Sequence, residues 1–200
     1  MTTTVRGRAA TKGKELKMED LAARHSPVRV VDPEFEGLSL SVVIPAYNEE
    51  GAVRQTIEDV RAEMDATGVP YEIIVIDDGS SDRTMEIAQS TGVIVDTNQV
   101  NTGYGASLKR GIRQAQYDYV AIIDADGTYP ARYLPPMLKL CRTQDMVVGD
   151  RGAAMKNVPL IRRPAKWMLN KLASFLAERR LSDLNSGLRV FRKSELMPFI

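Results

Sequence analysis

The strongest constraint on the fold is an alternation, between residues 38 and 150, of short apolar segments with longer segments of helical periodicity. Apolar runs such as LSVVIP and YEIIVID are typical of strands buried on both faces. Between these two runs, apolar residues recur at helical spacing from Val53 to Met64, and Gly68 predicts the end of that helix. Strands that alternate with helices form a parallel sheet covered on both faces. We therefore expect an α/β fold with a Rossmann-like, mostly parallel sheet.

The rest of the chain continues this alternation. The sequence predicts further strands at VIVD (93–96), YVAIID (119–124) and DMVVG (145–149), and helices within 80–92 and 106–116 and after Pro130. A long amphipathic segment covers 159–180, and the stretch 184–200 predicts a loop, a strand and a helix start.

Two parts of the chain are distinguished by composition. Residues 1–37 are polar and basic, which predicts a mobile N-terminal arm. Residues 38–200 form the predicted domain, which is of ordinary size for a single hydrophobic core. The chain ends on Pro198, Phe199 and Ile200 without a polar termination, so we expect the C-terminal part of the domain to be incomplete.

Composition excludes several classes of site. The chain has one cysteine, Cys141, so it forms no internal disulfide, which fits a reducing, cytoplasmic compartment. Its one histidine, His25, lies in the N-terminal segment, which excludes His-rich zinc sites and a Ser-His-Asp arrangement in the domain. No apolar stretch reaches the roughly 18 to 20 residues that a membrane helix needs.

Charge is unevenly distributed in a chain whose net charge is +1. Residues 151–180 contain eight basic residues and one acidic residue, a local charge of +7. Such a run is commonly a solvated helix face. It also suits an anionic ligand, and it is the basis for expecting peripheral contact with the anionic inner face of a membrane. Because the basic residues are not interleaved with an aromatic stacking platform, we do not expect a nucleic-acid partner.

Acidic residues follow three of the predicted strands at the point where each strand ends. They occur in PAYNEE (45–50), DDGSSD (77–82) and DADG (124–127), and GDR (149–151) adds an arginine after the fifth strand. Each cluster alone also fits a turn or a helix cap. Because ligands of open α/β sheets bind at the carboxyl ends of the strands, we expect these side chains to share one rim.

Asp124 and Asp126 are the most informative of these acids. In an extended chain, residues two apart project to the same side, and like charges that close repel unless a cation lies between them. Mg²⁺ or Mn²⁺ binds few protein carboxylates and completes its shell with water and substrate phosphates. We therefore expect a divalent metal at Asp124 and Asp126 that holds a diphosphate.

Five segments, in order, resemble the motifs of the family-2 glycosyltransferases of GT-A fold. They are VVIPAYNEE, IIVIDDGSSDRT, NTGYGASLKRGI, YVAIIDADGTYP and DLNSGLRVF, and they extend from about Leu40 to Phe191. The resemblance is strongest to the dolichol-phosphate mannose synthase and polyprenyl-phosphate glycosyltransferase group. One position departs from the mannose synthases, because Thr128 stands where they would have a metal-binding glutamine.

The resemblance implies roles for particular residues. The implied nucleotide-binding residues are Pro45, Ala46, Tyr47, Glu49, Asp77, Asp78, Gly103, Gly105 and Asp124. The implied metal ligands are Asp124 and Asp126, and the implied catalytic residues are Asp126, Arg151, Asp183 and Arg189. For the acceptor, the resemblance implies Ser186 and Gly187, and the basic stretch adds Arg162, Arg163 and Lys166.

The hypothesis is an inverting, metal-dependent transfer of a hexose from a UDP- or GDP-linked donor to a polyprenyl- or dolichyl-type lipid phosphate. A phosphate acceptor is already a nucleophile at neutral pH, whereas an alcohol acceptor needs a general base, for which Asp183 is the candidate. Two alternatives stay open, namely transfer to a saccharide hydroxyl and a non-catalytic subunit that binds nucleotide-sugar. A dinucleotide-binding dehydrogenase is disfavoured because its Gly-x-Gly-x-x-Gly is absent at the first strand–helix turn.

Overall fold

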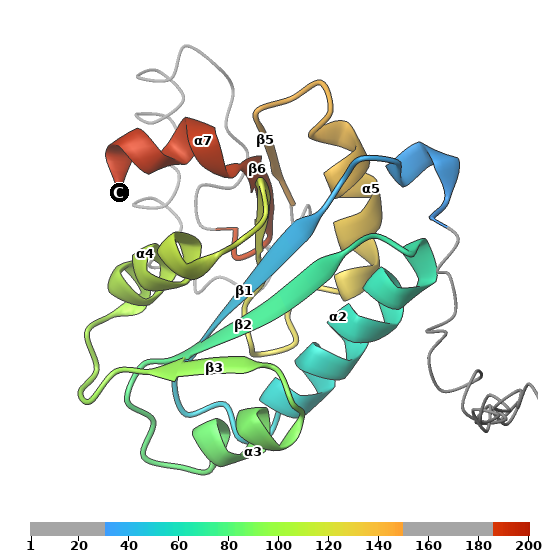
Figure 1. The fold of residues 1–200 in the computed structure, drawn as a ribbon. Helices are drawn as coiled ribbons and strands as arrows, with labels where there is room; N and C mark the ends of the chain where they lie inside the picture. The colour runs from blue at the N-terminus through green and yellow to red at the C-terminus, as the bar shows by residue number, and fades with distance from the viewer. Residues whose placement is uncertain (1–30, 150–185) are drawn as a thin grey trace, which may run out of the picture. The chain divides into compact units, whose positions relative to one another are not determined.

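The computed structural model describes residues 31–149 and 186–200, which form a six-stranded sheet with helices on both faces (Figure 1). The strands lie in the order β3-β2-β1-β4-β6-β5. All neighbouring pairs are parallel except those of β6, which runs antiparallel to β4 and to β5. The strands are β1 (Leu40–Ala46), β2 (Tyr71–Asp77), β3 (Ile94–Thr97), β4 (Tyr119–Ile122), β5 (Met146–Val148) and β6 (Arg189–Arg192). The predicted mostly parallel α/β sheet is thus confirmed.

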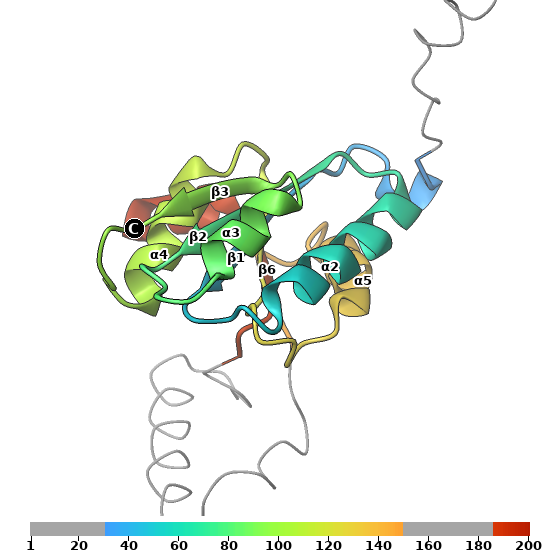
Figure 2. The ribbon, with the colours of Figure 1, turned by 90° about the horizontal axis from the view of Figure 1, so that it is seen from below.

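The helices divide between the two faces of this sheet, as the two views in Figures 1 and 2 show. α2, α3 and α5 cover one face, and α4 and α7 cover the other. The α-helices are α2 (Val53–Thr67), α3 (Thr84–Ser90), α4 (Tyr104–Gln114), α5 (Leu134–Leu140) and α7 (Lys193–Leu196). The short 3-10 helices are η1 (Pro33–Phe35), η2 (Ala131–Tyr133) and η5 (Met197–Phe199).

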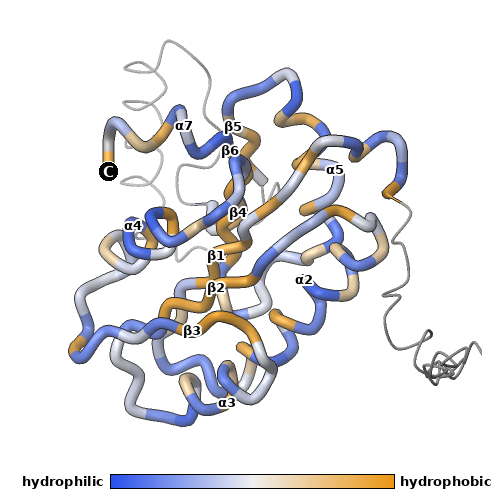
Figure 3. The backbone as a smooth tube through the Cα atoms, in the orientation of Figure 1, coloured by the Kyte–Doolittle hydropathy of each residue, from blue (hydrophilic) through white to orange (hydrophobic). Residues whose placement is uncertain are grey.

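The central strand β1 shows why the apolar runs are continuous. Every residue of β1 is buried, and its side chains alternate between two cores. Val42 and Ile44 pack with the helices α2 and α5, whereas Val43 packs on the opposite face beside α4. A strand covered on both faces needs apolar residues at consecutive positions, which agrees with the apolar band along the central strands in Figure 3.

A glycine lets helix α4 pack closely against the sheet. A methyl group on Gly111 would lie 2.4 Å from a side-chain carbon of Val43 and 3.1 Å from one of Ile76. No Cβ makes a contact that short, so the absence of a side chain lets the helix approach β1 and β2. This contact fixes the position of the first turn of α4, which takes part in the site described below.

The boundary predicted at residue 37 needs a correction. Phe35 and Leu38 are 4% and 5% exposed and belong to the core beside α2 and α5, and Val31 packs against it. The side chains of Lys139 and Arg142 contact residues Glu34 and Glu36 of this segment. Apolar Phe35 therefore anchors residues 31–37 to the domain, while residues 1–30 of the predicted arm lie outside the described residues.

The strand order places a crevice at a defined point of the sheet. β1 is followed in the chain by β2 and β3 on one side, but its neighbour on the other side is β4. At such a switch point the connections leave in opposite directions, and ligands bind beyond the carboxyl ends of the two strands. Because β6 is antiparallel to β4, its beginning, with the turn at 186–188, reaches the same end. Within the described ranges, no helix combines the length and the apolar character that crossing a bilayer requires.

Candidate functional site

A pocket of about 340 Å³ opens beyond the carboxyl ends of β1 and β4, where the topology predicts a site. It brings together residues from four separate loops and helix starts. Its lining residues are Pro45, Ala46, Tyr47, Glu49, Asp78, Asn101, Tyr104, Ser107, Asp124, Ala125 and Asp126. Seven of these were singled out from the sequence, so acidic groups from the first, second and fourth strand ends do meet at one rim.

The loop after β1 is held in place by the loop after β2. Backbone N–H groups of Glu49 and Glu50 donate to the side chains of Thr84 and Asp82, at 2.7 and 3.1 Å. In the other direction, the side chain of Asn48, at a positive φ of 56°, accepts a hydrogen bond from the N–H of Ser81. These reciprocal hydrogen bonds place Tyr47 and Glu49 at the pocket, because both loops must adopt their conformations together.

Asp82, the last acid of DDGSSD, serves this loop contact. Its carboxylate accepts from the N–H and the hydroxyl of Thr84 as well as from the N–H of Glu50. Although desolvation acts to raise it, these hydrogen bonds hold the pKa of Asp82 below its usual value. Asp82 does not line the pocket, so this acid stabilises the loop that presents Glu49.

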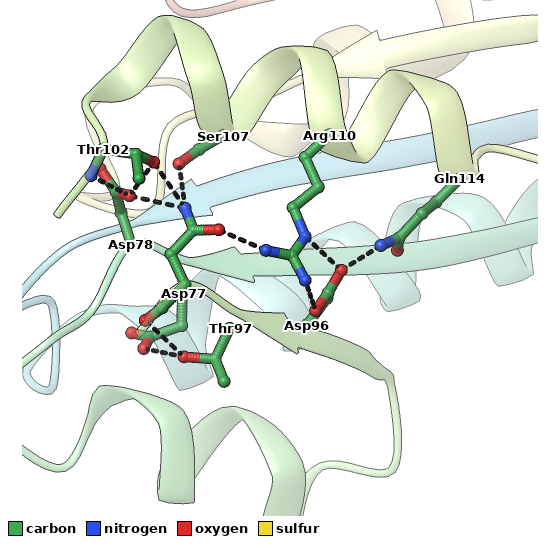
Figure 4. Close-up of polar contacts among 9 residues, drawn as sticks. Asp77, Asp78, Asp96, Thr97, Thr102, Ser107, Arg110 and Gln114 are labelled. Carbon is green, nitrogen blue, oxygen red and sulfur yellow. Dashed lines mark hydrogen bonds and ion pairs between the residues drawn. The ribbon is translucent and has the colours of Figure 1, made fainter. Parts of the chain in front are cut away.

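Asp78 lines the pocket, and its carboxylate holds the loop that precedes α4 (Figure 4). Oδ1 accepts from the side chain of Asn98 and from both the N–H and the hydroxyl of Thr102, at 2.7 to 2.9 Å. Oδ2 accepts from the N–H of Gly103 at 2.8 Å. Burial alone would raise the pKa of Asp78, but these hydrogen bonds lower it to about 2. The residue is therefore ionised at any ordinary pH.

Asp77, which was predicted to bind the nucleotide, does not line the pocket. Its Oδ2 accepts from the hydroxyl of Thr97 and, at 3.3 Å, from the N–H of Ser80. The side chain is 2% exposed, and within the described residues its Oδ1 has no hydrogen-bond partner. A buried carboxylate oxygen without a donor is costly, so a donor from water or from a ligand would satisfy it.

The glycines predicted beside the nucleotide have different settings. Gly103 lies at the start of α4 with a φ of 92°, a conformation that favours glycine, and its N–H binds Asp78. Gly105 lies in the exposed first turn of α4 and does not line the pocket. On the other side of the loop, a methyl group on Gly79 would lie 2.9 Å from the carbonyl carbon of Val100. Gly79 therefore permits the loop 98–103 to pack against the turn after β2.

Asp124 and Asp126 lie in the turn that follows β4, beyond the extended strand in which their geometry was predicted. Ala125 between them is buried, and its carbonyl accepts from the hydroxyl of Thr56 in α2. This anchor explains how two residues outside a strand still line one pocket. The N–H of Thr128 donates to Oδ1 of Asp126 at 2.9 Å, so the backbone of residue 128 orients this aspartate.

The aspartate pair lies close enough to Glu49 in the pocket to raise its proton affinity. Burial raises the pKa of Glu49, and the negative charges of Asp126, Asp82 and Asp124 raise it further. Tyr104 donates to Oδ1 of Asp124 at 2.8 Å, and its own pKa is raised by burial and by this carboxylate. Negative potential of this kind favours a bound cation.

The turn at 186–189 packs directly against the aspartate pair. A methyl group on Gly187 would lie 1.6 Å from Oδ2 of Asp124, so only glycine fits there. The N–H of Gly187 donates to the hydroxyl of Tyr129 at 2.7 Å. The hydroxyl of Ser186 is engaged with the backbone of Leu188, and Nε of Arg189 donates to the carbonyl of Ser186. Ser186 is buried and does not line the pocket.

The residues present fit a hard divalent cation. In the part of the chain that the structure describes, no group of three or more His, Cys, Asp or Glu side chains converges as a metal cage. Two neighbouring carboxylates suit Mg²⁺ or Mn²⁺, which takes few protein ligands and completes its shell from water and phosphate. Asp124 and Asp126 would hold such an ion, and the charge that raises the pKa of Glu49 is what the ion would offset.

Several predicted residues lie outside the described ranges. They are Arg151, Asp183 and the basic residues Arg162, Arg163 and Lys166. Sequence reasoning missed Ala125, which lies between the two predicted aspartates, and three lining residues after β3, namely Asn101, Tyr104 and Ser107. All three follow β3 within or beside the segment NTGYGASL, and Tyr104 stands between the two glycines that were singled out. The position of that segment after a parallel strand was the available signal.

Comparison with known proteins assigns the family. The model of glycosyl transferase family 2 matches residues 41–196. A dolichyl-phosphate hexose transferase of Haloferax volcanii is 34% identical over 82% of this chain and 70% of its own length. An undecaprenyl-phosphate 4-deoxy-4-formamido-L-arabinose transferase of Edwardsiella ictaluri is 32% identical over 78% of this chain. The chain spans about half of that relative, 49% of its length.

A solved structure supports the same assignment. Glucosyl-3-phosphoglycerate synthase of Mycobacterium tuberculosis, in complex with Mn²⁺ and uridine-diphosphate-glucose, superposes with a TM-score of 0.62 and 26% identity. The match covers 82% of this chain and 59% of that one. The resemblance noted in the five sequence motifs is thereby confirmed. The chain belongs to glycosyl transferase family 2 and has the GT-A fold.

Proposed function

We propose that this chain transfers a hexose, with inversion, from a nucleoside-diphosphate sugar to a polyprenyl- or dolichyl-type lipid phosphate. One observation carries the proposal, namely that Glu49, Asp124 and Asp126 line one pocket at the switch point of the sheet. Concentrated carboxylates beside an open pocket suit a cation with a diphosphate, the shared part of every nucleotide-sugar donor.

The pocket offers separate places for the parts of the donor. We assign the nucleoside to the side formed by Pro45, Tyr47 and Asp78, because it combines apolar surface with a rigidly held acid. We assign the diphosphate to the side of Asp124 and Asp126, which would hold Mg²⁺ or Mn²⁺. When bound, the ion would neutralise the negative charge that develops on the leaving diphosphate.

The described residues prepare this site in advance. Tyr104 and Gly187 restrain Asp124 from two sides, and the N–H of Thr128 orients Asp126, so little reorganisation is needed when the donor arrives. In the transfer, the bond between the anomeric carbon and the diphosphate oxygen breaks, and its electron pair leaves with the diphosphate. An oxygen of the acceptor phosphate forms the new bond on the opposite face of the sugar.

A phosphate acceptor is supported by chemistry and by the relatives. With a second pKa near about 6, a phosphate monoester is largely dianionic at neutral pH and needs no general base. The relatives from Haloferax volcanii and Edwardsiella ictaluri carry names that specify dolichyl and undecaprenyl phosphate. The basic stretch 151–180 would match both the acceptor phosphate and an anionic membrane surface. We assign acceptor contacts to Arg162, Arg163 and Lys166, and contact with the phosphates to Arg151.

A transfer assay tests the proposal. Protein is incubated with Mn²⁺, vesicles that contain a polyprenyl phosphate, and UDP- or GDP-linked hexoses labelled in the sugar. We expect label that extracts into organic solvent, that requires Mn²⁺ or Mg²⁺, and that is lost in Asp126→Ala. Vesicles without polyprenyl phosphate serve as the control.

Other outcomes favour the alternatives. Label that appears only in water-soluble glycan would support a saccharide hydroxyl as acceptor. If the protein binds a nucleotide-sugar in the presence of metal but releases no nucleotide with any of the acceptors tested, the result would support a non-catalytic subunit. Full transfer by Asp126→Ala in the presence of a chelator would remove the metal role from the proposal.

A further inference from the structure

An arginine that does not line the pocket connects helix α4 to strand β3 (Figure 4). Arg110, in the second turn of α4, donates from Nε and one terminal nitrogen to the two oxygens of Asp96 in β3. Gln114, one helical turn further along α4, donates to the same carboxylate. The paired, planar contact fixes the guanidinium in one orientation, as bidentate arginine–carboxylate pairs do.

The remaining terminal nitrogen of Arg110 donates to Oδ1 of Asn98. The amide nitrogen of Asn98 is thereby turned the other way, where it donates to Asp78 at 2.7 Å and to Thr102 at 2.8 Å. Arginine can only donate, and an ionised aspartate can only accept, so the two neighbours force the same orientation of the amide. Asn98 is 8% exposed, which makes a reversed orientation costly.

Asp78 connects the Asn98 amide to the loop that forms one wall of the pocket. It binds the N–H groups of Thr102 and Gly103, the last two residues before α4. The next residue, Tyr104, lines the pocket and donates to Asp124. A continuous series of hydrogen bonds therefore runs from Arg110, through Asn98 and Asp78, to the loop that forms one side of the site.

We propose that Arg110 is a positioning residue that holds the loop 98–103 as a wall of the donor pocket by fixing the Asn98 amide. The name donor pocket depends on the proposed function, but the ordering of the loop does not. A simpler role, in which Arg110 only ties α4 to β3 through Asp96, would leave the loop ordered when Arg110 is replaced, because Asn98 would keep its hydrogen bonds to Asp78 and Thr102. The two roles thus predict different results for Arg110→Met, whereas Asn98→Asp tests whether the loop depends on the Asn98 amide.

The test compares Arg110→Met and Asn98→Asp with Arg113→Met, an exposed arginine on the same helix. Asn98→Asp keeps an acceptor for Arg110 and places a second carboxylate beside Asp78. Hydrogen exchange of the amides of Thr102 and Gly103 is measured without ligand, with the amide of Val43 in β1 as an internal reference. Calorimetry then measures the affinity for UDP and GDP with Mn²⁺.

We expect both Arg110→Met and Asn98→Asp to increase exchange at Thr102 and Gly103 while Val43 stays protected. Nucleoside-diphosphate affinity should fall about tenfold in both variants, as expected for the loss of one or two hydrogen bonds, and should be unchanged in Arg113→Met. Wild-type protection of the loop in either Arg110→Met or Asn98→Asp would overturn the inference. If the wild-type protein binds neither nucleotide, the proposed function fails, while the exchange result still decides the role of Arg110.

Discussion

Among single residues, Gly187 constrains the site more than any charged group does. Its α-carbon lies so close to Asp124 that a methyl group would overlap Oδ2 at 1.6 Å. Its N–H is also fixed, by the hydroxyl of Tyr129. Moving the turn away from Asp124 would break the buried hydrogen bond between Gly187 and Tyr129. Moving Asp124 away from the turn would break its hydrogen bond with the hydroxyl of Tyr104. The absence of a side chain at residue 187 is therefore required for the observed position of Asp124.

The first prediction at this scale concerns Gly187→Ala. The added methyl should displace the Asp124 carboxylate or the turn, at a cost of about 1 to 3 kcal/mol in unfolding free energy. Because Asp124 is then misplaced, Mn²⁺-dependent affinity for UDP or GDP should fall at least about tenfold, which calorimetry measures.

Gly51→Ala is the matched control, because a methyl group there meets no atom within 4 Å. It should preserve both stability and affinity. Wild-type affinity in Gly187→Ala would show that the position of Asp124 relative to the turn is not needed for binding.

At the scale of elements, the loops after β1 and β2 behave as one unit. Thr84, at the first position of α3, is fully buried and uses its hydroxyl twice. The hydroxyl accepts from the N–H of Glu49 and donates to Asp82, which itself accepts from Glu50. The start of one helix thus determines where a pocket residue of another loop lies.

Thr84→Val tests this coupling, since valine keeps the shape and removes the hydroxyl. The partly buried N–H of Glu49 then lacks its acceptor, and we expect a loss of about 1 to 2 kcal/mol in the unfolding free energy measured by urea denaturation. Thr84→Ser, which keeps the hydroxyl, should lose less. Equal losses in the two variants would mean that packing, and not the hydrogen bond to Glu49, makes this position important.

The same loops show where sequence reasoning stops. The strand ends, the helices and the pocket acids Glu49, Asp124 and Asp126 follow from local patterns and from the rule for parallel sheets. The role of each acid in DDGSSD cannot be predicted in the same way, because it depends on which backbone N–H groups lie near that acid in the folded structure. The contact of Asp82 with Thr84 is local and agrees with the turn or cap that the cluster fits. The hydrogen bonds from Glu50 to Asp82 and from Gly103 to Asp78 join distant segments and have no signature in local sequence.

At the scale of the whole molecule, the direction of β6 completes the site. β6 follows a long connection in the chain, yet it inserts between β4 and β5 and runs against both. Its first residues therefore reach the end of β4 where Asp124 lies, which a parallel strand would not allow. Strand direction is a long-range property, since it depends on pairing between distant segments, and the apolar pattern of RVF does not specify it.

The last prediction concerns the stability of the molecule as a function of pH. The pKa of Asp78 is about 2 in the folded state, against a usual value of 3.8. A lowered folded-state pKa means that the ionised form stabilises the fold above about pH 4 and that this contribution is lost as the pH falls toward about 2. For the size of this shift, the loss is about 2 kcal/mol.

Asp78→Asn should remove this contribution. At neutral pH the variant should be less stable, because the amide cannot accept from Thr102 and Gly103 at both of its atoms. Between about pH 4 and pH 2 its stability should fall less steeply than that of the wild-type protein. The raised pKa of Glu49 makes its contribution to stability change with pH in the sense opposite to that of Asp78. Because Glu49 is present in both proteins, the difference between the two urea-denaturation series isolates the contribution of Asp78. Identical slopes in this range would show that the hydrogen bonds to Asp78 do not stabilise the folded molecule through its charge.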